Sequence, residues 1–338
     1  MNSYERLFSR MAGGPADRIP NNCIIMGFGA HYIGSTYREF VTDHKVLAEA
    51  AIRCHEDFGI DILSAISDPM REAEGYGSKI LLPEDAVPYA PEPLIKNIND
   101  ISKIRIPLPE SHNRMNDRLL AIRRMAEYSN KNCAVQGWIE GAFAEACDLM
   151  GISEMMMTIM TEPDAAKELL EYCTQGAIKF ALTQIEAGAD IIGIGDAAAS
   201  LIGPAMYEEY ALPYEIKIIN AIHIAGCSVR LHICGDINAI LQSTLKTGAD
   251  IIDCDWMVDF EHANKVFGDS ASACGNFDPV AVVLEGTPED VSDAVRKCIT
   301  GSSVRSIIAA GCEIPVNTPY ENLKAISDAL ELLSMKID

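Results

Sequence analysis

The chain has 338 residues, 49% of them hydrophobic, which is enough to bury the core of one large domain or two ordinary ones. Its 49 acidic and 27 basic side chains give a formal net charge of −22, which excludes nucleic acid phosphates and anionic membrane surfaces as partners. No apolar stretch is long enough for a signal peptide or a membrane span, and the 11 cysteines are too sparse for a disulfide scaffold, so we expect a cytoplasmic protein with reduced thiols.

Short apolar runs that end in Gly, Asp, Cys or Asn alternate with helical stretches along the chain. Two of the helical stretches are Ser153–Ala187, long enough for two helices joined near Glu162 and Pro163, and Met206–Ala225. Eight runs are predicted to be strands: Asn22–Gly27, Asp61–Ser67, Cys133–Trp138, Ala189–Gly195, Ser228–Cys234, Ala249–Cys254, Ser270–Gly275 and Val304–Gly311.

The same junction between a helix and a strand occurs twice, at Gly188–Ile192 and Gly248–Ile252, where a glycine ends a helix and Asp-Ile-Ile begins a buried strand. Eight strands alternating with helices predict an α/β protein, a (β/α)8 TIM barrel. A doubly wound open sheet is the alternative, but no Gly-x-Gly-x-x-Gly follows the first predicted strand. No linker divides the sequence, so we expect a single domain over residues 1–338, with residues 1–20 as a helical N-terminal extension outside the barrel.

A candidate metal site is formed by His232, Cys234 and Cys312. His232 and Cys234 lie two residues apart at the end of a predicted strand and therefore point the same way, and Cys312 follows the last predicted strand. The carboxyl ends of barrel strands meet at one mouth, so the three can converge there. One His and two Cys with an open fourth position are typical of catalytic zinc. The alternative is a hydrogen-bonded core histidine with ordinary buried thiols, and Cys254 or Cys274 could replace Cys312.

Carboxylates also follow predicted strands, where a barrel places its catalytic residues. They are Glu140, Asp196, and Asp253 or Asp255, and of these we take Asp196, Glu140 and Asp255 as the catalytic candidates. An acid there could protonate a leaving group, orient His232 through its second ring nitrogen, or fill the fourth metal position. The alternative role is to cap the next helix or accept a hydrogen bond from a loop amide.

His232-Ile-Cys234-Gly-Asp, followed far downstream by Gly311-Cys312-Glu-Ile-Pro, resembles the zinc signature of corrinoid-dependent methyltransferases of the uroporphyrinogen decarboxylase superfamily. The resemblance covers essentially the whole chain. Further matching segments are Asp17–Pro20, Glu72–Gly75, Gly188–Asp190, Asp253–Trp256, Gly275–Asn276 and Thr318–Asn322.

This resemblance implies a (β/α)8 barrel, a zinc ion, and methyl transfer to or from the cobalt of a methylcorrinoid or cob(I)alamin that a separate corrinoid protein carries. The chain itself has no Asp-x-His-x-x-Gly element of the kind that cobalamin-carrying domains use. Glu72 is implied as a further candidate for the fourth zinc ligand. We assign Glu72, His31 and Asn276 to the binding of the small substrate. A homodimer is one option for the assembly.

Two branches of the family fit the sequence. In one, a thiol such as coenzyme M takes a methyl group from methylcobalamin; in the other, an aryl methyl ether gives its methyl group to cob(I)alamin. Gln136–Gly151 is more similar to the O-demethylase methyltransferases, which favours the ether branch. A uroporphyrinogen decarboxylase is disfavoured, because Asn21–His31 lacks the arginines that bind a polycarboxylate. A non-catalytic barrel with a structural zinc is the alternative from another class.

Overall fold

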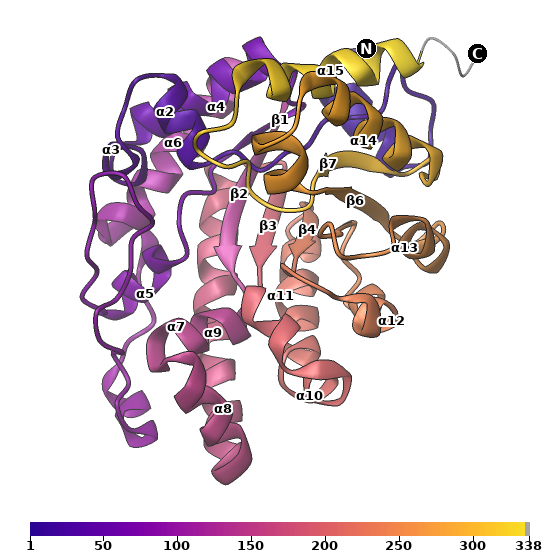
Figure 1. Cartoon of the computed structure of the whole chain (residues 1–338). Coiled ribbons are helices and arrows are strands. Elements are labelled where there is room, and N and C mark those ends of the chain that lie inside the picture. Colours follow the sequence, from indigo (N-terminus) through magenta and orange to yellow (C-terminus); the bar gives the residue numbers. More distant parts are fainter. Residues whose placement is uncertain (335–338) are drawn as a thin grey trace.

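The computed structural model describes residues 1–334 and contains a curled parallel sheet, with strands in the order β1 to β7 and helices packed around it (Figure 1). Its register places each strand beside the next one along the chain, so the carboxyl ends of all the strands lie at the same edge. The strands lie within seven of the eight predicted runs or overlap them: β1 (Ile62–Ser64), β2 (Ala134–Glu140), β3 (Ile191–Gly195), β4 (Ser228–His232), β5 (Ile251–Asp253), β6 (Ser272–Phe277) and β7 (Ile307–Ala310).

Helices connect successive strands and cover the outer face of the sheet (Figure 1). The α-helices are α1 (Ser3–Met11), α2 (Gly27–Tyr32), α3 (Tyr37–Thr42), α4 (His44–Phe58), α5 (Met70–Tyr76), α6 (Asn113–Ser129), α7 (Ala142–Met150), α8 (Ile152–Thr161), α9 (Pro163–Glu186), α10 (Gly203–Tyr210), α11 (Leu212–Ile224), α12 (Leu241–Leu245), α13 (Phe260–Phe267), α14 (Pro288–Thr300) and α15 (Tyr320–Ser334). Short helical turns are η1 (Ile98–Lys103), η2 (Pro109–Ser111), η3 (Ala197–Leu201), η4 (Asn238–Ile240) and the π-helix η5 (Pro279–Leu284). Over residues 1–334, none of these helices combines the length and the apolar character needed to cross a membrane.

The predicted pair of helices over 153–187 is confirmed as α8 and α9, which are separated at Glu162 because Pro163 has no N–H to continue the first helix. The stretch Met206–Ala225 is divided at Ala211 into α10 and α11, with Pro213 in the first turn of the second helix. Only the α1 part of the N-terminal extension is helical.

The repeated glycine junctions also form as predicted. Gly188 and Gly248 have φ angles of +114° and +82°, which end the preceding helices at little steric cost. Asp190 and Asp250 then play matching roles, because their carboxylates accept hydrogen bonds from the N–H groups at the start of β2 and at Val229 of β4, at 3.0 and 2.8 Å. Each junction therefore ties the start of a strand to its neighbour.

The predicted first strand, Asn22–Gly27, is wrong. Only Asn21 pairs with the sheet, through an isolated parallel bridge to Ile308 of β7, and α2 begins at the end of the predicted run. Its apolar character serves packing instead: Ile24 is buried in a small cluster with Ile66 and Trp138, against which Met26 packs. An apolar run this short does not distinguish a strand from a buried irregular segment.

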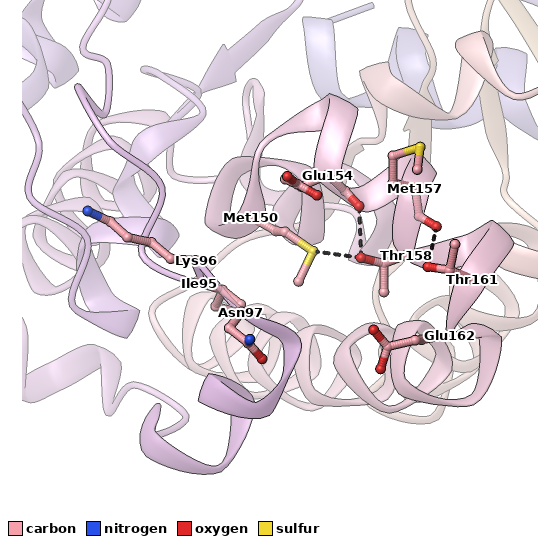
Figure 2. Close-up of a pocket in the computed structure, with 9 residues that line it drawn as sticks. All are labelled: Ile95, Lys96, Asn97, Met150, Glu154, Met157, Thr158, Thr161 and Glu162. Carbon is pink, nitrogen blue, oxygen red and sulfur yellow. Dashed lines mark hydrogen bonds between the residues drawn. The ribbon is translucent and has the colours of Figure 1, made fainter.

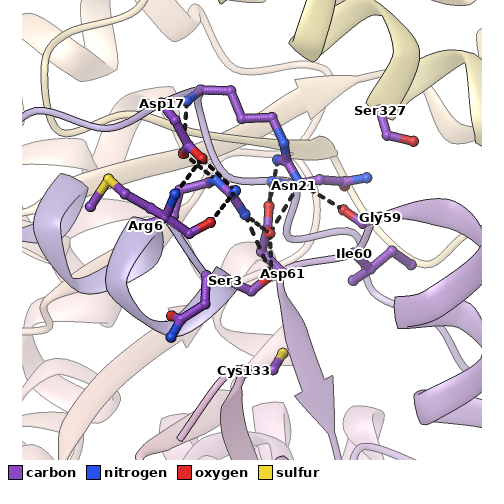
Figure 3. A network of polar contacts seen from close by, with 12 residues as sticks. Ser3, Arg6, Asp17, Asn21, Gly59, Ile60, Asp61, Cys133 and Ser327 are labelled. Atoms are coloured by element: carbon purple, nitrogen blue, oxygen red, sulfur yellow. Dashed lines mark hydrogen bonds and ion pairs between the residues drawn. The ribbon is translucent and has the colours of Figure 1, made fainter.

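The segment around Asn21 nevertheless joins the two edges of the curled sheet. The N–H of Asp61, just before β1, donates to the Asn21 carbonyl at 2.7 Å, and the N–H of Ile308 donates to the Pro20 carbonyl at 3.0 Å. The buried Asp61 carboxylate holds this junction, because it accepts from the Asn21 N–H at 2.7 Å and pairs with Arg6 and Arg18 at 2.6 Å each (Figure 3). Helix α1 is thereby tied to the residue that precedes β1.

We predict that Asp61→Ala lowers the free energy of unfolding by about 3–5 kcal/mol, because it leaves two largely buried guanidinium groups without their shared partner. Urea denaturation followed by circular dichroism measures the change. Asp17→Ala is the matched control: Asp17 pairs with the same Arg6 at 2.7 Å, but its side chain is 41% exposed, so a loss of about 1 kcal/mol or less is expected. Equal losses in the two variants would contradict the assignment of Asp61 as the central anion.

Candidate metal centre

His232, Cys234 and Cys312 converge at the carboxyl edge of the sheet. His232 is the last residue of β4, Cys234 lies two residues beyond it, and Cys312 lies two residues beyond β7. The His232 Nε2 atom is 2.9 Å from the Cys234 Sγ atom and 3.8 Å from the Cys312 Sγ atom, and the two sulfurs are 3.7 Å apart. Both thiols are free and partly exposed, so a ligand can reach them.

The donor set and its spacing fit zinc. Tetrahedral zinc with Zn–S bonds of about 2.3 Å places two sulfur ligands about 3.8 Å apart, close to the 3.7 Å between Cys234 and Cys312. Within residues 1–334, the only other cluster whose potential ligand atoms lie this close is Asp43, His44 and Asp117. That cluster contains no thiol, and Asp117 is already paired with Arg118.

Asp253 fixes the orientation of His232. The β4–β5 register pairs Leu231 with Ile252, which sets His232 opposite Asp253 on the neighbouring strand. The His232 Nδ1 atom lies 2.7 Å from Asp253, and Arg230 Nε lies 2.8 Å from the same carboxylate. Burial raises the pKa of Asp253, but Arg230 and His232 outweigh burial, so the net shift is downward and the group is an ionised acceptor. Nδ1 therefore donates, and Nε2 is left facing the two cysteines.

The three side chains share protons among their facing atoms. Burial lowers the pKa of His232, but the charge of Cys234 and the hydrogen bond to Asp253 raise it well above its ordinary value. The hydrogen bond between the two thiols, assisted by His232, lowers the pKa of Cys312 to about 4 and raises that of Cys234. A metal cation would replace these protons among the same atoms.

Asp255, predicted to be catalytic, supports the loops beside the cysteines. Its carboxylate accepts from the N–H groups of Gly235 and Trp256, both at 2.7 Å, and burial raises its pKa. Gly311 packs against it so closely that a Cβ atom there would lie 2.5 Å from the Asp255 Oδ1 atom. Asp255 therefore holds the backbone of Gly235, which follows Cys234, and packs against Gly311, which precedes Cys312.

Asn276, Cys254 and Cys274 contribute no donor to the cluster. The Asn276 side-chain amide donates to the carbonyls of Asp255 and Val258, at 3.2 and 2.6 Å, so it holds the loop after β5. Cys254 and Cys274 are fully buried and lie outside the cluster of potential ligands. The structure therefore pairs Cys234 with Cys312.

Glu72, Glu140 and Asp196 occupy a buried acidic region at the ends of β2 and β3. Glu72 pairs with Arg71 at 3.0 Å and accepts from the Glu140 N–H at 3.1 Å, and it is not part of the metal-capable cluster. Burial, then the charge of Glu72, raises the pKa of Glu140 well above its ordinary value. Asp196 accepts from the Ala144 N–H at 2.7 Å in the first turn of α7, and burial raises its pKa to about 7. This hydrogen bond matches the alternative role predicted for Asp196, which is to accept from a backbone amide.

Glu313, which the sequence did not single out, joins the metal-capable cluster to a cavity of about 600 Å³. It directly follows Cys312 and accepts from the Gly27 N–H at 3.1 Å. Burial raises the pKa of Glu313 to about 7, and the charge of Cys312 adds to this effect. His31 lies at the exposed rim of the same cavity. The position of Glu313 directly after a ligand at a strand end was the signal that could have identified it.

A separate cleft of about 260 Å³ lies between α8 and the chain around Ile95 (Figure 2). Its walls carry Met150, Glu154 and Thr158, and the Thr158 hydroxyl donates to the Glu154 carbonyl at 2.8 Å. It has no histidine or cysteine among its described lining residues. The groups that could bind a metal therefore lie at the cysteine pair, away from this cleft.

Comparison with known proteins agrees with this geometry. The model of the uroporphyrinogen decarboxylase (URO-D) family matches residues 2–332. The chain belongs to the uroporphyrinogen decarboxylase family. It is 32% identical over 326 residues, covering 95% of both chains, to the methylcobamide:CoM methyltransferase MtbA of Methanosarcina mazei. The methylcobamide:CoM methyltransferase MtaA of Methanosarcina barkeri is 27% identical, again with 95% of each chain covered.

A solved structure of a methyltransferase from Methanosarcina mazei superposes on this family member with a TM-score of 0.89, covering 98% of this chain and 99% of the other at 23% identity. At that identity the match supports the fold. Together with the relatives, it confirms the resemblance to corrinoid-dependent methyltransferases of this superfamily. The preference for the O-demethylase branch is not supported, because these relatives are named for coenzyme M.

We predict that the purified protein carries about one zinc ion per chain and that His232→Ala and Cys312→Ser each lose it, because two ligands hold the ion far more weakly than three. Metal analysis by mass spectrometry after dialysis measures the content. Cys274→Ser, a buried thiol outside the cluster, should keep its zinc. Full zinc retention in both ligand variants would rule out the site.

Asp253→Asn is expected to weaken zinc affinity about 10- to 100-fold, because an amide cannot fix the His232 tautomer as a carboxylate does. Competition with a chromophoric chelator measures the affinity. Asp250→Asn is the control, since Asp250 holds the start of β4, where it accepts from the Val229 N–H at 2.8 Å, away from the cysteines. Unchanged affinity in Asp253→Asn, with the fold intact by circular dichroism, would contradict this role.

Proposed function

We propose that the chain transfers a methyl group between the cobalt of a separate corrinoid protein and a small thiol, at a zinc ion held by His232, Cys234 and Cys312. The observation that carries this proposal is the open three-donor cluster at the carboxyl edge of the sheet, in a chain whose relatives are methylcobamide:CoM methyltransferases. Two cysteines and one histidine leave one tetrahedral position for a substrate sulfur.

In the proposed reaction the thiol sulfur forms a bond to the methyl carbon, and the carbon–cobalt bond breaks. The electron pair of the broken bond stays on cobalt, and the thiol proton is released to solvent. Zinc, when bound, supplies Lewis acidity that lowers the pKa of a bound thiol and favours the thiolate near neutral pH.

The residues of the chain hold this site in shape. Asp253 accepts the Nδ1 proton of His232 and keeps Nε2 directed at the cysteines, and Arg230 in turn holds Asp253 at 2.8 Å. Asp255 fixes the loop that follows Cys234 and packs against the residue before Cys312. We propose structural support as its main role, in place of direct acid catalysis.

A corrinoid partner is supported by the surface around the site. Several exposed apolar side chains lie in the loops that follow the strands, at the same edge as the cysteines. They are Leu201 after β3, Trp256 and Met257 after β5, Val280 after β6 and Val316 after β7. A protein that presents its corrinoid to the cysteines would cover these side chains.

We also propose that the whole chain acts as one (β/α)8 domain, in which the segment around Asn21 takes the place of the missing first strand. Its hydrogen bonds to the residues beside β1 and to β7 support this proposal. The family match over residues 2–332 agrees with a single unit.

Demethylation of a methoxyaromatic compound is a second candidate. The cavity beside Glu313 supports it, because its volume of about 600 Å³ and its walls of Tyr37, Val87 and Val316 suit an aromatic ring. Decarboxylation of a porphyrinogen is disfavoured by the lack of arginine in Asn21–His31. A purely structural zinc would require a fourth protein ligand, and the described cluster offers three.

We predict that the zinc-loaded protein demethylates free methylcobalamin when a small thiol is added, seen as a change in the corrinoid absorption spectrum. His232→Ala should reduce the rate to the background without enzyme. A parallel experiment with cob(I)alamin and methoxyaromatic compounds tests the second candidate, and turnover there alone would replace the thiol proposal. No spectral change with either pair would contradict both.

A further inference from the structure

The cavity beside the metal-capable cluster carries acidic groups without cationic partners. Glu313 and Asp85 line it, together with the apolar walls of Tyr37, Val87 and Val316. Among the described residues of the lining there is no lysine or arginine. An anionic substrate group would therefore lose its water and meet carboxylates, with no cation to pair with.

The polar side chains of the lining are mostly occupied. The Tyr37 hydroxyl donates to the Ser67 carbonyl at 2.5 Å, and the Ser35 hydroxyl donates to Glu39 at 2.6 Å. His31 provides the basic side chain, and it lies at the exposed rim, where solvent screens it.

Three arginines that act on Tyr37 or directly follow it in the chain are committed elsewhere. Arg114 and Arg118, which act electrostatically on Tyr37, are paired with Asp68 and Asp117. The Arg38 guanidinium is turned to the Leu82 carbonyl at 2.7 Å. None of these three is a lining residue of the cavity.

We propose that this cavity binds the small substrate of the methyl transfer and selects an uncharged or positively charged substrate over an anionic one such as the sulfonate of coenzyme M. This inference rests on the proposed function and makes it more specific. The corrinoid relatives named for coenzyme M would then differ from this chain in the substrate they accept.

Three thiols with the same two-carbon spacing test the proposal: 2-mercaptoethanesulfonate, 2-mercaptoethanol and 2-aminoethanethiol. With methylcobalamin as the donor, the zinc-loaded enzyme should show a kcat/KM at least about tenfold higher for the neutral or cationic thiol than for the sulfonate, because the cavity offers an anion no partner. The rates are compared at high salt, where long-range repulsion by the net charge of −22 is screened. Equal kcat/KM values for the sulfonate and the neutral thiol would overturn the inference.

Variants that each remove one acidic side chain test whether this cavity is the source of the substrate selectivity. Asp85→Asn should shift the ratio of kcat/KM values about three- to tenfold toward the sulfonate, because it removes an acidic group from the wall. Glu313→Gln should shift the ratio in the same direction by less, because burial raises the pKa of Glu313 to about 7 and leaves the group only partly ionised near neutral pH. Glu154→Gln is the matched control, since it removes an acid of the same kind from the separate cleft of Figure 2 and should leave the ratio unchanged. An unchanged ratio in both cavity variants would overturn the assignment to this cavity.

Measuring how tightly the methylated products bind tests this inference independently of whether the enzyme transfers a methyl group. Calorimetric titration with 2-(methylthio)ethanesulfonate, 2-(methylthio)ethanol and 2-(methylthio)ethylamine requires no turnover. If no thiol is methylated, the proposed function fails, and the order of these three affinities still decides the inference. Tighter binding of the sulfonate would overturn it, and weaker binding would support it.

Discussion

The curl of the sheet is the constraint on which the metal-capable cluster depends. Three strand spacings separate β4 from β7, so in a flat sheet their ends would lie about 14 Å apart, yet the Cys234 and Cys312 sulfurs are 3.7 Å apart. Only strong curvature brings them together. The junction at Asn21 maintains that curvature by bonding to both edges, and Asp61 fixes the junction with a buried charge. An ionic contact at one end of the strands thus supports the convergence of the three potential ligands at the other.

The ion pair of Arg230 and Asp253 connects the core of the sheet to the site. Both side chains are buried, so each would be unfavourable without the other. His232 uses the second oxygen of the same carboxylate, and its orientation is therefore tied to the packing of β4 against β5. The imidazole is held by the sheet before any ligand arrives, which lowers the entropic cost of assembling a metal centre.

The sequence predicted most of the fold and the three potential ligands, because alternation of apolar runs and the strand-end rule are local signals. It failed at Asn22–Gly27, where the same apolar character serves packing around Trp138. It left open whether Asp253 or Asp255 faces the site, because both lie at the end of the same predicted strand, and the β4–β5 register is what sets Asp253 opposite His232. The cavity could not be predicted either: Asp85 comes from a long loop, and no periodicity fixes the path of that loop.

Apart from the segment after Cys312, which serves both, the walls of the cavity and the frame of the cysteine site come from different parts of the chain. The walls belong to α2, α3, the loop around Asp85 and the segment after Cys312, whereas β4 and β5 hold His232 and its partners. Substitutions in the walls can accumulate without moving the donor atoms. Substitutions in α2, α3 or the loop around Asp85 therefore change what the cavity can hold without altering the strands that position His232 and Asp253.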